Sequence, residues 1–249
     1  MSTPATLASM NLTSLKAACN SCILRQLCLP LGLEESDLDR LEKIINRRQR
    51  IKPGQHLYRA RDDFHHLYAI RRGFFKTYEL NNDGIEHING FHMTGELIGL
   101  DAISDEFHVC NAVALEDSEV CEVPFLKLEE LFRDIPALQH QFHRIMSREI
   151  GVDHSLMMLL GTMRAEEKLA TFLTNLAERL AARGLSSDSM HLSMSREDIG
   201  NYLGLKLETV SRMFSKFQDD GLIEVERRNL HIKDMDGLRK IAHCQHGGR

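Results

Sequence analysis

Residues 195–218, SREDIGNYLGLKLETVSRMFSKFQ, are the stretch that decides the fold of the C-terminal part of the chain. Ser195 and the acidic residues after it form a typical helix start, because a serine side chain caps backbone N–H groups and carboxylates stabilise the positive end of a helix. Gly204 can adopt the positive φ that a tight turn requires. A second helix is expected from about Lys206 to Gln218. The stretch therefore predicts two short helices joined by a tight turn.

The spacing within these two helices is that of a helix-turn-helix. Gly200 is the small residue expected where the helices touch, and Gly204 follows four positions later. Val210 and Met213 are the expected buried positions of the second helix. Such a turn places the second helix in the major groove of DNA, with its N-terminal residues at the base edges. A purely structural three-helix unit is the alternative.

Five side chains near the start of the second helix are expected to be exposed and to contact DNA: Lys206, Glu208, Thr209, Ser211 and Arg212. Arg212 can donate two hydrogen bonds to guanine, Glu208 can accept one from cytosine, and Ser211 can reach either partner.

Strand patterns occupy two other regions. From about residue 51 to residue 124, short runs rich in β-branched and aromatic residues alternate with turn signals such as Pro53-Gly54, which favours an antiparallel sandwich or barrel. Leu222–Val225 and Asn229–Lys233 look like two short strands. They would form the hairpin of a winged helix-turn-helix.

A long helical pattern lies between these regions and contains an a/d seam, in which spacings of three and four residues alternate. The seam consists of His143, Met146, Ile150, Asp153, Met157 and Leu160. Because the helix is long and its methionines are adaptable contacts, a dimer interface is favoured over packing onto its own domain. Two copies of Asp153 facing each other would repel, so dimerisation would be easily biased by another event.

Six cysteines are present in a chain with no visible secretory signal and no apolar run of about 18 residues, so a cytoplasmic location is expected. In that compartment clustered cysteines bind metal or do redox chemistry more often than they form disulfides. Cys19, Cys22 and Cys28 form C-x2-C-x5-C, which can converge on one metal centre. Spacing allows an iron–sulfur cluster, a zinc ion or incidental thiols. The remaining cysteines are each a possible fourth ligand: Cys110, Cys121 and Cys244.

The charge and the motifs exclude two classes of protein. A net charge of −5 excludes a basic protein that coats nucleic acid, so DNA binding rests on motif geometry. No nucleophile–base pair, phosphate-binding loop or dinucleotide motif is visible, so an enzyme is not expected.

From about Cys19 to about Ile241 the chain resembles the Crp–Fnr family, and within it the FNR/Anr type. The motifs that carry the resemblance are Cys19–Cys28, Gly95–Ala102 (GELIGLDA), Val120–Pro124 (VCEVP), Asp198–Leu205 (DIGNYLGL) and Glu208–Arg212 (ETVSR).

The resemblance implies a [4Fe–4S] cluster on four cysteines: Cys19, Cys22, Cys28 and Cys121. Cys121 is picked by its Cys-Glu-x-Pro context, whereas Cys110 and Cys244 are extra to the family pattern. The implied α+β fold has four parts: an N-terminal arm with the cysteine loop (1–29), an antiparallel jelly-roll sensor barrel of the cyclic-nucleotide-binding type (30–134), a long dimerisation helix (135–162) and a winged helix-turn-helix (163–249).

The implied function is that of a homodimeric transcription activator of anaerobic genes, in which an oxygen-sensing cluster controls dimerisation and DNA affinity. The expected partners are RNA polymerase and a palindrome resembling TTGAT-N4-ATCAA, read by Glu208, Ser211 and Arg212. The alternative is the same regulator with a structural zinc ion, or with a haem or nitric-oxide signal. Residues 99–119 contain no Arg or Lys to pair with a cyclic phosphate, so a cyclic nucleotide is not expected.

Overall fold

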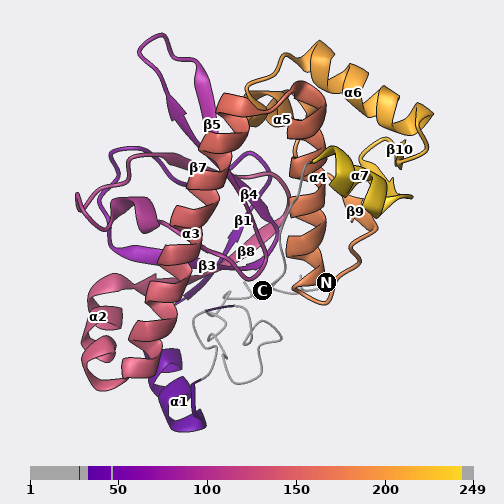
Figure 1. Cartoon of the computed structure of the whole chain (residues 1–249). Helices are drawn as coiled ribbons and strands as arrows, with labels where there is room; N and C mark the ends of the chain where they lie inside the picture. The colour runs from indigo at the N-terminus through magenta and orange to yellow at the C-terminus, as the bar shows by residue number, and fades with distance from the viewer. Residues whose placement is uncertain (1–27, 29–32, 46, 243–249) are drawn as a thin grey trace, which may run out of the picture.

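The computed structural model describes Cys28, residues 33–45 and residues 47–242 (Figure 1). Cys19, Cys22 and Cys244 lie outside the described residues. The elements follow the chain as α1 (Glu35–Ile44), β1 (Arg47–Ile51), β2 (His56–Tyr58), β3 (His66–Arg72), β4 (Phe74–Leu80), β5 (Glu86–Met93), β6 (Leu97–Ile98), a 3-10 turn (Leu100–Ala102), β7 (Asn111–Ala114), β8 (Ser118–Pro124), α2 (Phe125–Asp134), α3 (Pro136–Thr162), α4 (Ala165–Ala181), β9 (Ser189–His191), α5 (Arg196–Leu203), α6 (Leu207–Asp219), β10 (Ile223–Glu226), β11 (Asn229–Ile232) and α7 (Met235–Ile241).

The first eight strands form the expected antiparallel barrel. One sheet has the strand order β1-β8-β3-β6 and the other has the order β2-β7-β4-β5. The inner faces share one apolar cluster, to which β3 and β8 contribute Ile70 and Val120 and β4 contributes Phe75. Side chains alternate between the two faces of a strand, so the pattern of short apolar runs fills this interior from both sheets.

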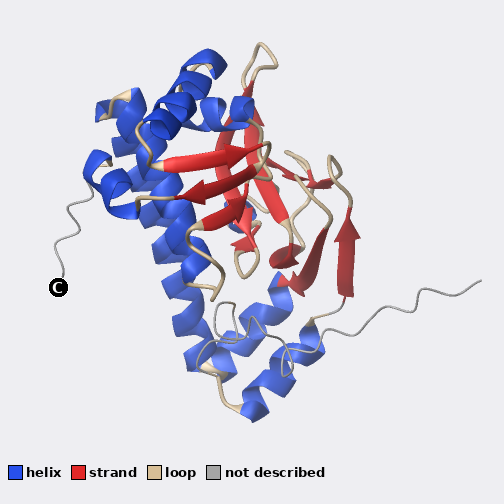
Figure 2. Ribbon diagram, turned by 90° about the vertical axis from the view of Figure 1, so that its right-hand side faces the viewer, coloured by secondary structure: helices blue, strands red, loops and turns tan. Residues whose placement is uncertain are grey.

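Helices cover the outer face of the sheet β1-β8-β3-β6. Leu67 and Val123 point from this face into a second apolar cluster, which includes Leu41 of α1, Leu128 of α2 and Phe142 of α3. Figure 2 shows the helices gathered along one side and one end of the strands. We call this second cluster the outer layer; it lies between the sheet and the first half of α3.

The long helix α3 confirms the helical pattern predicted for this region. It starts with Pro136 at its first turn, where the missing N–H costs nothing. Leu138 and Ile145 bury one face in the outer layer, and Leu159 packs into the C-terminal core. Among the described residues no helix has the length and apolar content needed to cross a bilayer.

The C-terminal part is a winged helix-turn-helix, with three strands in the order β10-β11-β9 beside α5 and α6. The predicted hairpin is confirmed, and both its strands end within one residue of the expected positions. One core position of α6 differs from the sequence prediction. Met213 is half-buried, whereas Val210, Phe214 and Phe217 are fully buried, because residues four and seven positions after Val210 share its helix face.

A buried lysine joins the end of the long helix to the helix-turn-helix. The ammonium group of Lys168, on α4, donates to the carbonyl of Leu160 at 3.2 Å and to the carbonyl of Leu203 at 3.2 Å. These carbonyls belong to the last turns of α3 and α5, where intrahelical partners run out and the helix dipole favours a cation.

Replacing Lys168 by Met should lower the free energy of unfolding by about 2 kcal/mol, because two buried carbonyls lose a charged donor. Urea denaturation followed by circular dichroism measures the change. Lys216→Met removes a more exposed lysine paired with Glu166 and should unfold like the wild type. Equal midpoints for the two variants would contradict the role given to Lys168.

Candidate nucleic-acid interface and metal centre

The turn between α5 and α6 has the geometry that the sequence predicts. The Ser195 hydroxyl accepts from the Asp198 N–H at 3.0 Å, and the Asp198 carboxylate accepts from the Ser195 N–H at 2.9 Å, which makes a capping box. Gly204 has a φ of 63°. A Cβ atom on Gly200 would lie 2.7 Å from the backbone oxygen of Leu205, so this contact between the helices requires glycine.

The start of α6 carries the five residues expected to contact DNA, and α6 lies at the outer edge of the molecule (Figure 1). Lys206, Glu208 and Arg212 are exposed. Thr209 and Ser211 were also expected to be exposed, but both are half-buried, because they flank Val210 on the side of the helix that turns toward the core. The exposed part of the expected DNA-contacting set therefore consists of three charged side chains.

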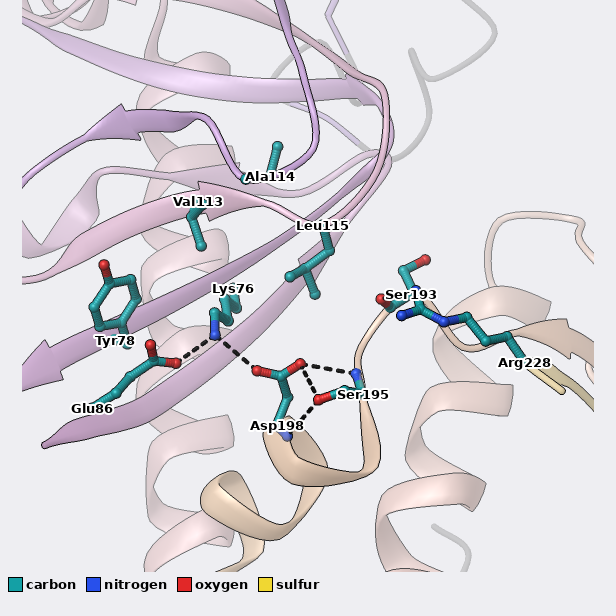
Figure 3. Close-up of a pocket in the computed structure, with 11 residues that line it drawn as sticks. Lys76, Tyr78, Glu86, Val113, Ala114, Leu115, Ser193, Ser195, Asp198 and Arg228 are labelled. Carbon is teal, nitrogen blue, oxygen red and sulfur yellow. Dashed lines mark hydrogen bonds and ion pairs between the residues drawn. The ribbon is translucent and has the colours of Figure 1, made fainter. Parts of the chain in front are cut away.

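Helix α5 is fixed to the barrel by a charged contact that the sequence does not indicate. The Lys76 ammonium, on β4, lies 2.8 Å from the Asp198 carboxylate and also pairs with Glu86 (Figure 3). Burial alone would lower the pKa of Lys76, but its hydrogen bonds to the two carboxylates raise it. Burial would likewise raise the pKa of Asp198, and the bond from Lys76 turns the shift downward. Both groups are therefore charged where the domains meet.

Asn201 adds a second contact between α5 and the barrel. Its side-chain amide donates to the carbonyl of Glu86 at 2.6 Å and accepts from the N–H of Ile88 at 2.7 Å. Strand β5 is the last strand of its sheet, so these two backbone groups have no neighbouring strand on that side. Asp198 and Asn201 both belong to the DIGNYLGL motif, and both contact the barrel.

A half-buried carboxylate makes the third contact between the barrel and the C-terminal part. Glu96 lies 2.7 Å from the guanidinium of Arg179 and 2.6 Å from that of Arg183. Burial would raise the pKa of Glu96, but the two arginines outweigh it and hold that pKa below its usual value. Phe91 of β5 packs between Phe172 and Tyr202, so barrel and C-terminal domain share one continuous core.

Two of the expected cluster ligands pack against the same outer layer. Cys121 lies near the middle of β8, opposite Arg48 of β1 and Ala69 of β3, and its side chain joins Val123 on the outer face of the sheet. Cys28 packs against this layer as well. Among the described residues no group of three or more His, Cys, Asp or Glu side chains is arranged to hold a metal ion.

Cys110 lies on the other side of the sheet. It is buried in the inner cluster of the barrel, where its thiol donates to the Asp101 carboxylate at 3.4 Å. Burial raises the pKa of this thiol far above its usual value. The ring of His108 stacks on Tyr58 at 3.6 Å beside it. Spacing alone could not decide between Cys110 and Cys121 as the fourth ligand. Their positions in the fold differ, because only Cys121 shares a layer with Cys28.

The expected dimer seam lies along the side of α3 that faces away from its own core. Five of the six seam residues are exposed: His143, Ile150, Asp153, Met157 and Leu160. Met146 differs, because it is half-buried and packs against the outer layer. The exposed apolar members of the seam are Ile150 (54% exposed), Met157 (62%) and Leu160 (41%).

Comparison with known proteins gives matches over most of the chain. The family model for a Crp-like helix-turn-helix domain matches residues 167–241, and that for a cyclic nucleotide-binding domain matches residues 48–134. The chain is 47% identical to the transcriptional activator protein Anr of Pseudomonas protegens, over 97% of this chain and 98% of that protein. It is 45% identical to the fumarate and nitrate reduction regulatory protein of Escherichia coli, over 90% of each chain.

Among solved structures, FixK2 from Bradyrhizobium japonicum matches with a TM-score of 0.72 and 29% sequence identity. The match covers 78% of this chain and 96% of that chain.

Replacing Asn201 by Ala should expose the Ile88 N–H, which loses its acceptor. Loss of one such hydrogen bond, about 1 kcal/mol, should speed amide exchange at Ile88 about fivefold. Hydrogen exchange read by NMR or mass spectrometry of a β5 peptide measures it. Asn89→Ala is the matched control on the same strand, since the Asn89 side chain donates to Glu79 of the neighbouring strand β4 and not to α5. Unchanged exchange in Asn201→Ala would show that the contact does not fix α5 to β5.

Proposed function

The chain belongs to the Crp–Fnr family of DNA-binding transcription regulators, in its FNR/Anr type, and we propose that it controls anaerobic gene expression by sensing oxygen through a [4Fe–4S] cluster. Its relatives are transcription regulators rather than enzymes. The observation that carries the oxygen-sensing proposal is the placement of Cys28 and Cys121 against one layer of the structure.

The proposed DNA contacts come from the start of α6. Arg212 offers a bidentate donor for guanine, Glu208 an acceptor for cytosine, and Lys206 a cation for a phosphate. Ser211 and Thr209 are half-buried, so their short side chains would contact DNA only where it lies against the helix. Two copies of α6 in a dimer would read half-sites about one helical turn apart, as a palindrome resembling TTGAT-N4-ATCAA requires.

The donor set suits an iron–sulfur cluster held by Cys19, Cys22, Cys28 and Cys121. Thiolates are the ligands that such clusters take. A bound cluster would supply an oxygen-reactive centre. The Cys110 thiol is protonated, hydrogen-bonded and enclosed in the inner cluster, so it is a poor competitor for the fourth position.

The outer layer provides a route from the cysteines to the dimer helix. Cys28, Cys121 and Met146 all pack against this layer, and Met146 lies on α3 within the proposed seam. Order in the cysteine loop would therefore favour one packing of α3, and with it the dimer. Asp153 would oppose dimerisation, because it is exposed in the monomer and two copies brought together in the seam would lose water and repel each other. We propose that oxygen shifts the balance between these two effects.

The same proposal assigns the remaining parts of the chain. Residues 1–29 form the cysteine-bearing arm, 30–134 the sensor barrel, 135–162 the dimerisation helix and 163–249 the DNA-binding domain. RNA polymerase is the proposed partner at promoters. Binding of a cyclic nucleotide is not proposed, because residues 99–119 offer no cation for its phosphate and Asp101 places a carboxylate inside the barrel.

Arg212→Ala should weaken binding to the palindromic duplex by about 1–3 kcal/mol and relax the preference at one base pair of each half-site. Fluorescence anisotropy under anaerobic conditions at fixed salt measures both effects. Lys240→Ala, which removes another exposed cation, on α7, should bind like the wild type. If Arg212→Ala weakened binding equally to the palindrome and to duplexes with single base substitutions, Arg212 would contact a phosphate instead of a base.

Protein purified without oxygen should contain about four iron and four sulfide ions per chain and lose its visible absorption in air. Cys121→Ser should lose the iron, because it removes a ligand, whereas Cys110→Ser should keep it. Elemental analysis and absorption spectra of both variants provide the test. One zinc ion per chain and no colour, or a haem spectrum, would replace the oxygen signal with the alternative one.

A further inference from the structure

We propose that Arg48 positions and neutralises the cysteine site: its guanidinium donates a hydrogen bond to the sulfur atoms of a cluster bound at Cys121, on the outer face of β8, and at Cys28. This inference rests on the proposed cluster, and it gives a role to a residue that no motif of the chain includes. Arg48 would act on the cluster through its thiol ligands, as a positioning residue rather than a ligand.

The strand register places Arg48 beside Cys121. β1 and β8 are antiparallel, and Arg48 lies directly opposite Cys121. Directly opposed residues of an antiparallel pair project from the same face of the sheet, with Cβ atoms about 5 Å apart. Ile51, at odd spacing from Arg48, enters the inner cluster instead. The Arg48 side chain therefore leaves the sheet on the face where Cys121 and Cys28 meet the outer layer.

The guanidinium of Arg48 has a buried donor without an acceptor. Its Nε is the single buried side-chain nitrogen or oxygen, among the described residues, that makes no hydrogen bond. Two neighbouring arginines on the same sheet behave differently: Arg71 and Arg50 both lie against Glu119, at 2.6 Å and 4.0 Å. An unpaired buried donor on a charged group is costly, so it indicates an acceptor that the described residues do not supply.

A cluster held by four thiolates supplies both the charge and the acceptor. Such a group is an anion, and an anion in a partly buried layer needs a cation beside it. A guanidinium is permanently charged and has five N–H donors, so it can stabilise several sulfur atoms at once. Hydrogen bonds to the sulfurs are one of the means by which a protein adjusts such a cluster. Groups that support metal ligands in this way commonly change metal affinity about 10- to 100-fold.

The test compares three variants purified without oxygen: Arg48→Met, Arg48→Lys and Arg50→Met. Arg50 is the matched control, because it lies on the same strand and face but is 73% exposed and near Glu119. Two quantities are measured: iron and sulfide per chain, and the rate at which an iron chelator removes iron in the absence of air. Arg48→Met should lose iron about tenfold faster than the wild type, and Arg50→Met at the wild-type rate. Arg48→Lys keeps the charge but not the Nε donor and should fall between them.

The outcomes separate this inference from the proposed function. A wild-type protein without iron and sulfide overturns the proposed function itself. A loaded wild type whose iron is released no more slowly than that of Arg48→Met overturns the role of Arg48 alone. Circular dichroism and thermal melting show whether Arg48→Met folds. If it does not, Arg48→Lys decides, and release at the wild-type rate then overturns the proposal.

Discussion

The half-buried Glu96 carboxylate, held between Arg179 and Arg183, is the interaction on which the arrangement of the two domains depends. A lone carboxylate in this position would lose its charge, and two arginines without the carboxylate would repel each other. The charged contact therefore requires all three side chains. Around them the aromatic ring of Phe91 and the apolar residues of α4 make one core from two domains. The orientation of the DNA-reading helix is therefore set by the sensor barrel and not by a flexible link.

Sequence reasoning succeeded where structure is local. The capping box at Ser195, the left-handed Gly204 and the close approach at Gly200 depend on residues within about ten positions of one another, and all three are present. It failed for contacts across the fold: nothing in the sequence pairs Lys76 with Asp198, more than one hundred residues away. It also misjudged Met213, because neighbouring positions on a short helix compete for one core and packing decides between them.

The cysteines show the same limit at a finer scale. Spacing predicted a site at Cys19, Cys22 and Cys28, and a family resemblance selected Cys121 as the fourth ligand, but spacing could not distinguish Cys121 from Cys110. The fold separates them, because Cys110 precedes β7 and is buried inside the barrel, whereas the alternation of faces along β8 sends Val120 into the barrel and Cys121 out of it. A shift of one residue in the register of β8 would exchange the two faces. The side of the sheet on which Cys121 lies thus depends on the register of strands that are distant in sequence.

The contact of Asn201 with β5 has a consequence for solubility. β5 is an edge strand, and exposed edges are templates for intermolecular sheet growth. By capping the Glu86 carbonyl and the Ile88 N–H, a side chain of the DNA-binding domain acts as a blocking group on that template. Any excursion of the domain away from the barrel removes the blocking group. The same contact that fixes the domain to the barrel thus also protects the barrel from edge-to-edge association.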